Sequence, residues 1–146
     1  MATPRDAFEA NGDLHALTDA LTDIVGTEHV LTDEPTRALY SQDIYSRGRP
    51  VDVVVRPNDT ASLAAVIAAA THAGRAVIPR GGGMSYTGGY LATESGSVLV
   101  DMARMNRVLE INREDMTVTV ECGCTWQALH EALKGTGLRT PFWGTL

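Results

Sequence analysis

The 146-residue sequence is short of cysteine, of aromatic residues and of positive charge. It holds 2 cysteines and 5% aromatic residues, and its 12 lysines and arginines face 18 aspartates and glutamates, for a net charge of −6. The basic residues form no cluster, which argues against a protein that follows the phosphate backbone of a nucleic acid. A small anionic ligand held by backbone amides is compatible with this charge.

Long apolar runs are also missing. The longest extends from Leu63 to Ala70 and is too short to cross a bilayer. Residues 1–13 lack the apolar stretch of a secretory signal. We therefore expect a cytoplasmic protein without a membrane span.

The cysteine and histidine patterns predict no metal site. Cys122 and Cys124 are spaced C-x-C, and no second pair completes a zinc site. We interpret them as two reduced thiols between a strand and a helix. The four histidines are scattered, and none stands at a metal-ligand spacing from another.

The chain has the length and the 44% apolar content of an ordinary single domain. Leucine and isoleucine recur at helical spacing over residues 13–25, and Gly26 falls where such a helix ends. Residues 27–50 contain Pro35, Gly48 and Pro50, so we expect a loop there with one short helical turn around residues 36–39.

A βαβ unit is predicted between residues 51 and 78. Val51 to Val55 is almost continuously β-branched, which is typical of a strand covered on both faces. The next strand, Ala76 to Ile78, follows a helix over residues 61–73, so the two strands should be parallel. The helix can be capped by Asn58, Asp59 or Thr60, and its expected buried face consists of Leu63, Val66, Ile67 and Ala70.

Three further elements are predicted after this unit. Ser97 to Asp101 has the pattern of a strand, and Val108 to Asn112 with Met116 to Glu121 has that of an antiparallel hairpin. A last helix over residues 126–134 should be capped by Thr125. Its expected buried stripe consists of Trp126, Leu129 and Leu133.

Between the second strand and the third, five of the 14 glycines fall within residues 81–89. A phosphate-binding P-loop would need lysine and serine or threonine where Gly89 and Tyr90 stand. A dinucleotide fingerprint would need glycine at Tyr86 and a helix after the loop. Neither motif fits this sequence.

Two interpretations of the glycines remain open from the residues alone. Consecutive amides of a glycine-rich loop can converge on an anion, with Arg80 adding a positive charge and Ser85 and Thr87 adding hydroxyl donors. Such a site would suit a pyrophosphate. The other interpretation is a mobile surface loop without a ligand.

The stretch from Pro79 to Ser85, with Gly88 and Gly89 after it, resembles the pyrophosphate-binding loop of a known family. This is the vanillyl-alcohol oxidase / p-cresol methylhydroxylase (PCMH-type) family of FAD-dependent oxidoreductases. The similarity continues in Tyr40 to Asp43, Val55 to Pro57, Val100 to Asn106 and Val118 to Gly123. It covers nearly the whole chain, from Leu14 to Leu146.

The resemblance implies an α+β fold in which two subdomains hold FAD between them. Residues 1–50 would be a lead-in, and residues 51–146 an FAD-binding domain that is incomplete at its C-terminal end, with a βαβ subdomain and the start of the second. The residues implied to contact the cofactor are Arg80, Gly81, Gly82, Gly83, Met84, Ser85, Gly88, Gly89, Gly123, Cys124, Gly144 and Thr145.

Family members that bind FAD covalently through this loop carry a histidine near Gly83 or Met84, and none lies between His72 and His130. The resemblance therefore implies noncovalent FAD. The loop is most similar to that of the glycolate and D-lactate dehydrogenases, which implies hydride transfer from a small 2-hydroxy acid or alcohol to FAD and a further electron acceptor. No residue of this sequence is identified as the catalytic base.

Two other functions stay open at this point. One is a non-catalytic nucleotide-binding or interaction module, and the other is an NADPH-using FAD reductase of peptidoglycan precursor synthesis. For residues 1–146 alone we expect weak or absent FAD binding and no activity, because part of the cofactor cradle and the whole substrate site would lie outside them.

Overall fold

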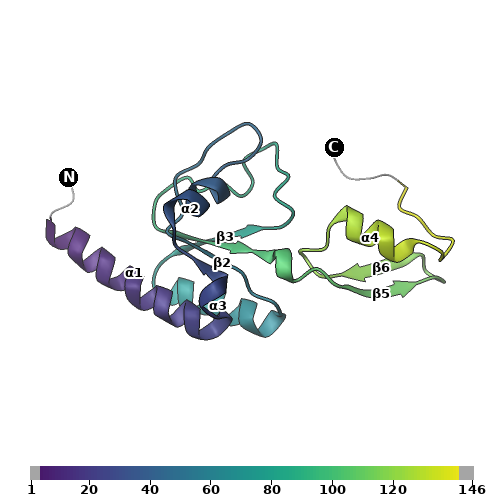
Figure 1. Ribbon diagram of the computed structural model, residues 1–146, viewed down its shortest axis with the longest axis horizontal. Helices are drawn as coiled ribbons and strands as arrows, with labels where there is room; N and C mark the ends of the chain where they lie inside the picture. Colours follow the sequence, from purple (N-terminus) through teal and green to yellow (C-terminus); the bar gives the residue numbers. More distant parts are fainter. Residues whose placement is uncertain (1–3, 142–146) are drawn as a thin grey trace.

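The computed structural model describes residues 4–141, with side chains from residue 14 onward. A four-stranded sheet with its helices forms one unit, and a two-stranded hairpin with one helix forms another beside it (Figure 1). The two units are joined by the short 3-10 helix η2 (Met102–Arg104). No helix among the described residues is long and apolar enough to cross a membrane.

The four-stranded sheet has the strand order β1-β2-β4-β3. β1 (Val30–Leu31) pairs antiparallel with β2 (Val53–Val55). β4 (Ser97–Asp101) is parallel to both β2 and β3 (Ala76–Arg80). The βαβ prediction is thus correct for strand direction, but β4 separates the two strands. All five residues of β4 are buried, which favours the central position for this strand.

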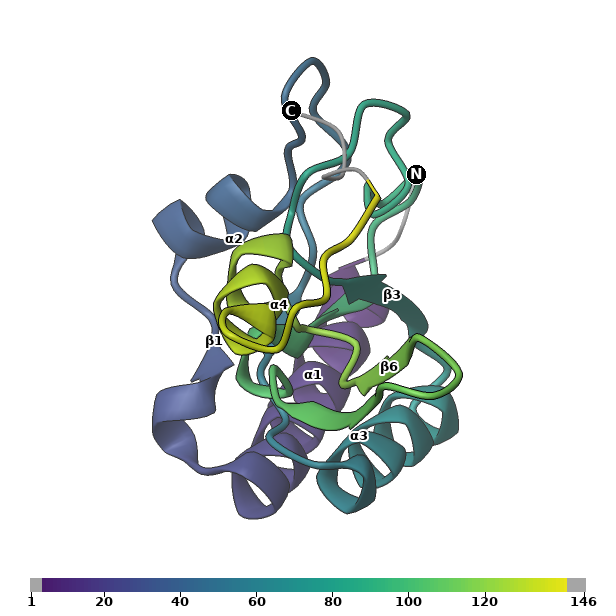
Figure 2. The same cartoon turned by 90° about the vertical axis from the view of Figure 1, so that its right-hand side faces the viewer.

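One face of the sheet is covered by α1 (Pro4–Val25) and α3 (Thr60–His72) (Figures 1 and 2). Leu17 and Leu21 of α1 and Val66 and Ala70 of α3 are buried against the sheet valines. Ile67 was expected on the buried face but is 39% exposed, because the stripe that meets the sheet is centred on Val66 and Ala70. Helix α3 starts with a capping box between Asp59 and Ser62.

Two predicted boundaries near the N-terminus were wrong. Helix α1 begins at Pro4, before the expected start at residue 13, since one glycine at position 12 costs a helix only about 1 kcal/mol. The expected loop over residues 27–50 contains η1 (Thr27–His29), β1 and α2 (Glu34–Tyr40). Asp33 caps α2 by accepting a hydrogen bond from the Thr36 amide.

The opposite face of the sheet is covered by α2 and by the loops that follow α2 and β3 (Figure 1). Its smaller apolar cluster contains Val51, Val54, Ala92 and Leu99. Arg49 and Ala92 form an isolated antiparallel bridge, so residues 41–50 run alongside the end of the glycine-rich segment. This arrangement gathers the irregular segments at one side of the sheet.

The second unit confirms the predicted hairpin, in which β5 (Val108–Asn112) pairs antiparallel with β6 (Thr117–Val120). Met116 was predicted in the strand but lies in the turn, with φ of 53°. In the same turn, Asn112 Oδ1 accepts hydrogen bonds from the amides of Glu114 and Asp115. Helix α4 (Trp126–Leu133) is capped by Thr125 as predicted. It buries Leu129 and Leu133, whereas Trp126 is 47% exposed, contrary to the expected stripe.

Candidate functional site

The glycine-rich loop begins at Arg80, the last residue of β3, on the side of the sheet where parallel strands end. Gly83 and Gly88 have φ of 74° and 70°, a region that L side chains rarely adopt. At Gly83 a β-carbon would also lie 2.2 Å from the Arg80 guanidinium. The backbone conformation therefore favours glycine at position 83, and a larger residue there would also displace the Arg80 guanidinium.

The amides of the loop fall into two groups. Those of Gly82, Gly83, Met84 and Ser85 make no hydrogen bond to the described part of the protein. The amides that follow are already committed to side-chain oxygens: Thr87 and Gly89 donate to Ser85 Oγ at 3.3 and 3.2 Å, and Gly88 donates to Asp43 Oδ2 at 3.0 Å. Among these seven amides, only those of the first group are free to donate to a ligand.

Arg80 lies under this loop rather than beside it. Its Cζ is 4.7 Å from the ring centroid of Tyr40 and 5.2 Å from that of Tyr90, both within cation–π range. Within residues 14–141 the guanidinium forms no ion pair, and its buried Nε has no hydrogen-bond partner. A positive charge without a contacting carboxylate thus lies directly against Gly83.

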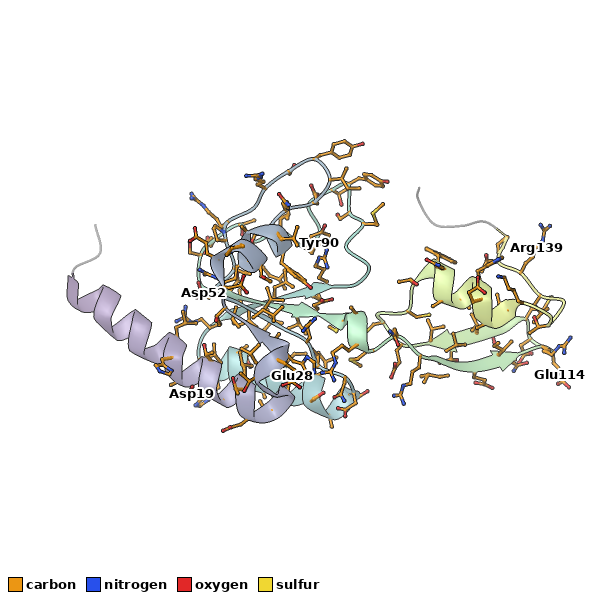
Figure 3. The ribbon with its side chains drawn as sticks, viewed as in Figure 1. Asp19, Glu28, Asp52, Tyr90, Glu114 and Arg139 are labelled. Atoms are coloured by element: carbon orange, nitrogen blue, oxygen red, sulfur yellow. The ribbon has the colours of Figure 1, made fainter. Side chains whose placement is uncertain are left out.

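The two tyrosines fix the loop and the arginine. Tyr90 is buried and donates a hydrogen bond of 2.8 Å to the carbonyl of Gly83 (Figure 3 labels Tyr90). Tyr40 donates a hydrogen bond of 2.8 Å to Asp101 Oδ2. Burial, followed by this hydrogen bond, raises the pKa of Tyr40, so its ring is an uncharged phenol at neutral pH.

The hairpin exit, which supplies two predicted contacts, lies beside the start of the loop. A β-carbon on Gly81 would be 3.6 Å from the carbonyl oxygen of Cys122. The next two amides are used within the protein, since Gly123 donates to Met105 O at 2.8 Å and Cys124 to Glu121 O at 3.0 Å.

Gly123 is buried, and a β-carbon there would meet Met102 O at 1.8 Å. Glycine at this position lets the two units approach each other, and any contact from Gly123 or Cys124 to a cofactor stays a prediction. Gly144 and Thr145 lie outside the described residues.

One part of the site was missed by sequence reasoning. Asp43 Oδ1 accepts hydrogen bonds from the amides of Tyr45 at 2.9 Å and Ser46 at 2.6 Å, while its Oδ2 accepts from Gly88. These bonds, that from Tyr45 first, lower the pKa of Asp43. An aspartate often bonds to amides just after it, but no local signal links it to a residue 45 positions away.

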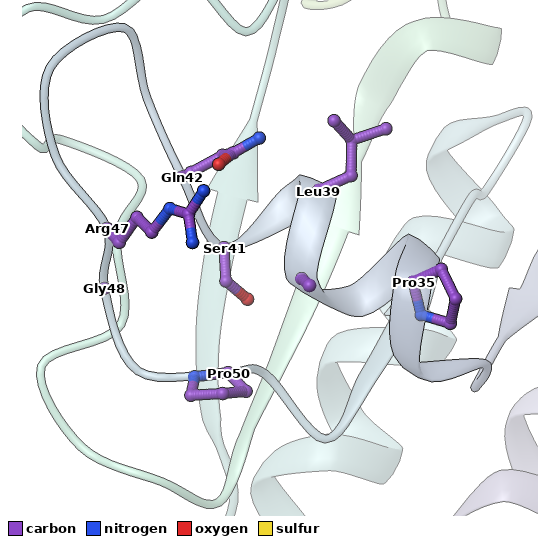
Figure 4. Close-up of a pocket in the computed structure, with 8 residues that line it drawn as sticks. Pro35, Leu39, Ser41, Gln42, Arg47, Gly48 and Pro50 are labelled. Atoms are coloured by element: carbon purple, nitrogen blue, oxygen red, sulfur yellow. The ribbon is translucent and has the colours of Figure 1, made fainter.

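A pocket of about 410 Å³ lies between α2 and residues 41–50, away from the free amides (Figure 4). Ser41 lines it, but its hydroxyl donates to Arg37 O at 2.7 Å and accepts from the Val51 amide, so it is not poised as a nucleophile. No group of three or more metal-ligating side chains occurs in the part of the chain that the structure describes.

The glycine-rich loop lies within the part of the chain that a known family model matches. A family model described as "FAD binding domain" matches residues 51–146. The chain is 30% identical over 121 residues to "1'-carboxy-chondrochloren decarboxylase" of Chondromyces crocatus, across 82% of this chain and 22% of that protein. It is 34% identical over 119 residues to "Probable D-lactate dehydrogenase, mitochondrial" of Danio rerio, across 81% and 24%. The solved structure of p-cresol methylhydroxylase matches with a TM-score of 0.75 at 16% identity, over 87% of this chain and 25% of that chain.

The chain thus spans about a quarter of the length of these relatives, which also include a glycolate oxidase subunit. The predicted α+β fold, the PCMH-type domain, the cofactor FAD and the D-lactate and glycolate branch are confirmed. With the family model covering most of its length, the chain belongs to the PCMH-type family of FAD-binding oxidoreductases.

Proposed function

We propose that residues 81–85 hold the pyrophosphate of a noncovalently bound FAD, in a protein that oxidises a small 2-hydroxy acid. The observation that carries this proposal is the run of amides from Gly82 to Ser85 that have no partner in the described structure. Consecutive free amides in a glycine-rich loop form a concave donor set that suits phosphate oxygens. The two charges of a pyrophosphate match this donor set and the cation beneath it.

The residues around the loop fit the same ligand. Arg80 adds a positive charge at short range, although its guanidinium is covered by the loop and contacts two aromatic rings. Tyr90 and Ser85 hold the loop open by bonding to its carbonyl and amides. The free amides therefore need little rearrangement to bind an anion, which lowers the entropic cost of binding.

FAD, when bound, would supply the acceptor for the hydride that leaves the substrate carbon, and this hydride carries both electrons of the oxidation. The chain's own part is to bind and orient the cofactor. With no histidine between His72 and His130, the loop offers no imidazole for a covalent link, which supports noncovalent binding. The general base and the substrate-binding residues are not among the residues assigned here.

The substrate class rests on relatives. One is named a D-lactate dehydrogenase and another a glycolate oxidase subunit, and both names denote small 2-hydroxy acids. A third is named a decarboxylase, so the FAD-binding part alone does not fix the reaction. We propose oxidation of a 2-hydroxy acid because these two relatives carry such names and because the glycine loop resembles that of their branch.

Binding is tested by titrating the ¹⁵N-labelled chain with FAD and following backbone amide resonances. We expect Gly82, Gly83, Met84 and Ser85 to shift with FAD and with ADP, which carry a pyrophosphate, and not with riboflavin, which carries none. The method detects weak binding, so it works for the 146-residue chain. FAD binding that shifts other resonances but leaves these four amides unchanged would overturn the proposed site.

The reaction is tested on a protein that carries this chain at the full length of its relatives, since no activity is expected for residues 1–146 alone. Candidate electron donors are added to its FAD-loaded form without oxygen. Loss of the oxidised flavin absorbance with D-lactate or glycolate is the expected result. Bleaching by NADPH alone would instead identify the peptidoglycan-precursor type of reductase. Binding of FAD without bleaching by any of the three donors would favour a nucleotide-binding module.

A further inference from the structure

Asp43 links the lead-in segment to the end of the glycine loop. It follows α2 in sequence and belongs to residues 41–47, which lie within the segment that was predicted to be a loop. In the structure its carboxylate reaches Gly88 across 45 residues of sequence, at 3.0 Å from Oδ2 to the amide nitrogen. The two segments therefore have one direct polar connection at this residue.

The two carboxylate oxygens have different partners. Oδ1 accepts from the amides of Tyr45 and Ser46, and the Asp43 amide donates to Ser46 O at 2.9 Å, which closes a tight turn. Oδ2 accepts from Gly88 alone among the described residues. One oxygen thus shapes the turn that carries Asp43, while the other holds the loop.

Besides the Asp43 bond, Gly88 is held by a local turn, in which its carbonyl accepts a hydrogen bond from the Leu91 amide at 2.9 Å. Gly88 has φ of 70°, and Gly89 is exposed, so the backbone here could adopt many conformations without an external partner. Two further contacts join residues 41–47 to the loop and its end. The rings of Tyr45 and Tyr86 have centroids 5.7 Å apart, and the Tyr90 hydroxyl lies 3.3 Å from the Gln42 carbonyl oxygen. A hydrogen bond to a carboxylate is roughly twice as strong as one between neutral groups.

We infer that Asp43 is a positioning residue for the pyrophosphate loop, which acts by binding the Gly88 amide and not by touching the cofactor. This inference rests on the proposed function of residues 81–85. The Ser85 hydroxyl accepts hydrogen bonds from the amides of Thr87 and Gly89, on either side of Gly88. Fixing Gly88 therefore also limits how far the free amides can turn away from one another. Three amides occupy the carboxylate oxygens, which weakens the repulsion that a nearby carboxylate would exert on a bound anion.

The variant Asp43→Asn separates the two functions of the side chain. Asparagine keeps one oxygen for Tyr45 and Ser46 and presents an NH₂ group to the Gly88 amide, so only the connection to the loop is lost. Asp33→Asn is the matched control, because it makes the same change of charge at the cap of α2, where asparagine also caps well. Asp43→Ala removes both sets of hydrogen bonds.

Two readouts test the inference. In Asp43→Asn the Gly88 amide resonance should move upfield and exchange faster with solvent, while those of Tyr45 and Ser46 change little. The dissociation constant for FAD should rise about tenfold, as expected if one loop in ten remains in the binding conformation. Asp33→Asn should change neither quantity, and Asp43→Ala should weaken FAD binding at least as much as Asp43→Asn.

The outcomes distinguish this inference from the proposed function. Unchanged FAD affinity in Asp43→Asn, with a wild-type chain that binds FAD, overturns the positioning role and leaves the function standing. FAD binding by the wild-type chain that leaves the amides of Gly82 to Ser85 unshifted overturns the proposed function. In that case, an unaltered Gly88 resonance in Asp43→Asn would also overturn the hydrogen bond between Asp43 and the Gly88 amide. A shifted Gly88 resonance would retain this hydrogen bond as a structural link between the two segments.

Discussion

The four-stranded sheet and the β5–β6 hairpin are both rich in β-branched residues, but only the sheet buries them. Every residue of β2 and β4 is buried. In β6, by contrast, Thr117, Thr119 and Val120 are exposed and Val118 is half-buried. The large apolar cluster extends no further along the chain than Met105. The sheet therefore has its own core, whereas the hairpin unit is stabilised only by the contacts among β5, β6 and α4.

The difference matters because the site lies where the two units meet. The free amides belong to the sheet unit, and the Cys122 carbonyl that contacts the start of the loop belongs to the hairpin unit. A rigid core thus positions one wall of the site, and a less buried unit positions the other. Loss of structure in the hairpin unit would leave the glycine loop in place but remove its neighbour.

The largest effect is expected from Leu99→Ala in β4, compared with Leu109→Ala in β5. Leu99 is fully buried in the cluster under the glycine loop, and removing its side chain should lower the free energy of unfolding by about 2–5 kcal/mol. Leu109 is 56% exposed, so its substitution should change stability by less than about 0.5 kcal/mol. Urea denaturation of both variants makes the comparison, and equal losses would show that the hairpin shares the core.

A smaller effect is expected from Gly123→Ala at the junction of the units. The new β-carbon would overlap the Met102 carbonyl, so we expect a loss of about 1–3 kcal/mol, nearer the upper value because backbone must move. Gly82→Ala is the control, since Gly82 has open space around it and should cost less than about 0.5 kcal/mol. Thermal unfolding measures both, and hydrogen exchange of the Cys124 amide shows whether the loss is local. An unchanged Gly123→Ala variant would mean that the units can separate freely.

Local patterns predicted most elements of both units but not their assembly. The capping of α3 and α4 and the pairing of β5 with β6 depend on residues close in sequence, and these predictions were correct. β1 was missed because two residues carry no periodicity and become a strand only by pairing with β2. The position of β4 between β2 and β3 likewise depends on contacts between distant segments.

The candidate site divides in the same way. Glycine density indicated residues 81–89, and four consecutive free amides are found there. The residues that hold the loop are Tyr40 and Asp43, for which no role was predicted, and Tyr90 at the end of the loop. Their contacts depend on how α2 and the next loop lie over the sheet, which no local pattern encodes.

The smallest expected effect is on the stability of the protein in acid, and its test compares the helix caps of the two units. Asp59 caps α3, and hydrogen bonds from the Ser62 amide and then its hydroxyl lower the pKa of Asp59 below its usual 3.8. Thr125, which caps α4, does not titrate. In the unfolded chain Asp59 binds a proton more readily, so its contribution to stability is complete above about pH 5 and is lost as the pH falls through its lowered folded-state pKa.

We therefore expect the urea midpoint of Asp59→Asn to fall less than that of the wild type between about pH 6 and pH 3, because asparagine caps the helix at every pH. Thr125→Asn exchanges one non-titrating cap for another, and its midpoint should follow the wild-type pH dependence throughout. Parallel curves for Asp59→Asn and the wild type would contradict the prediction. They would mean that the acid sensitivity of the sheet unit comes from carboxylates other than the cap of α3.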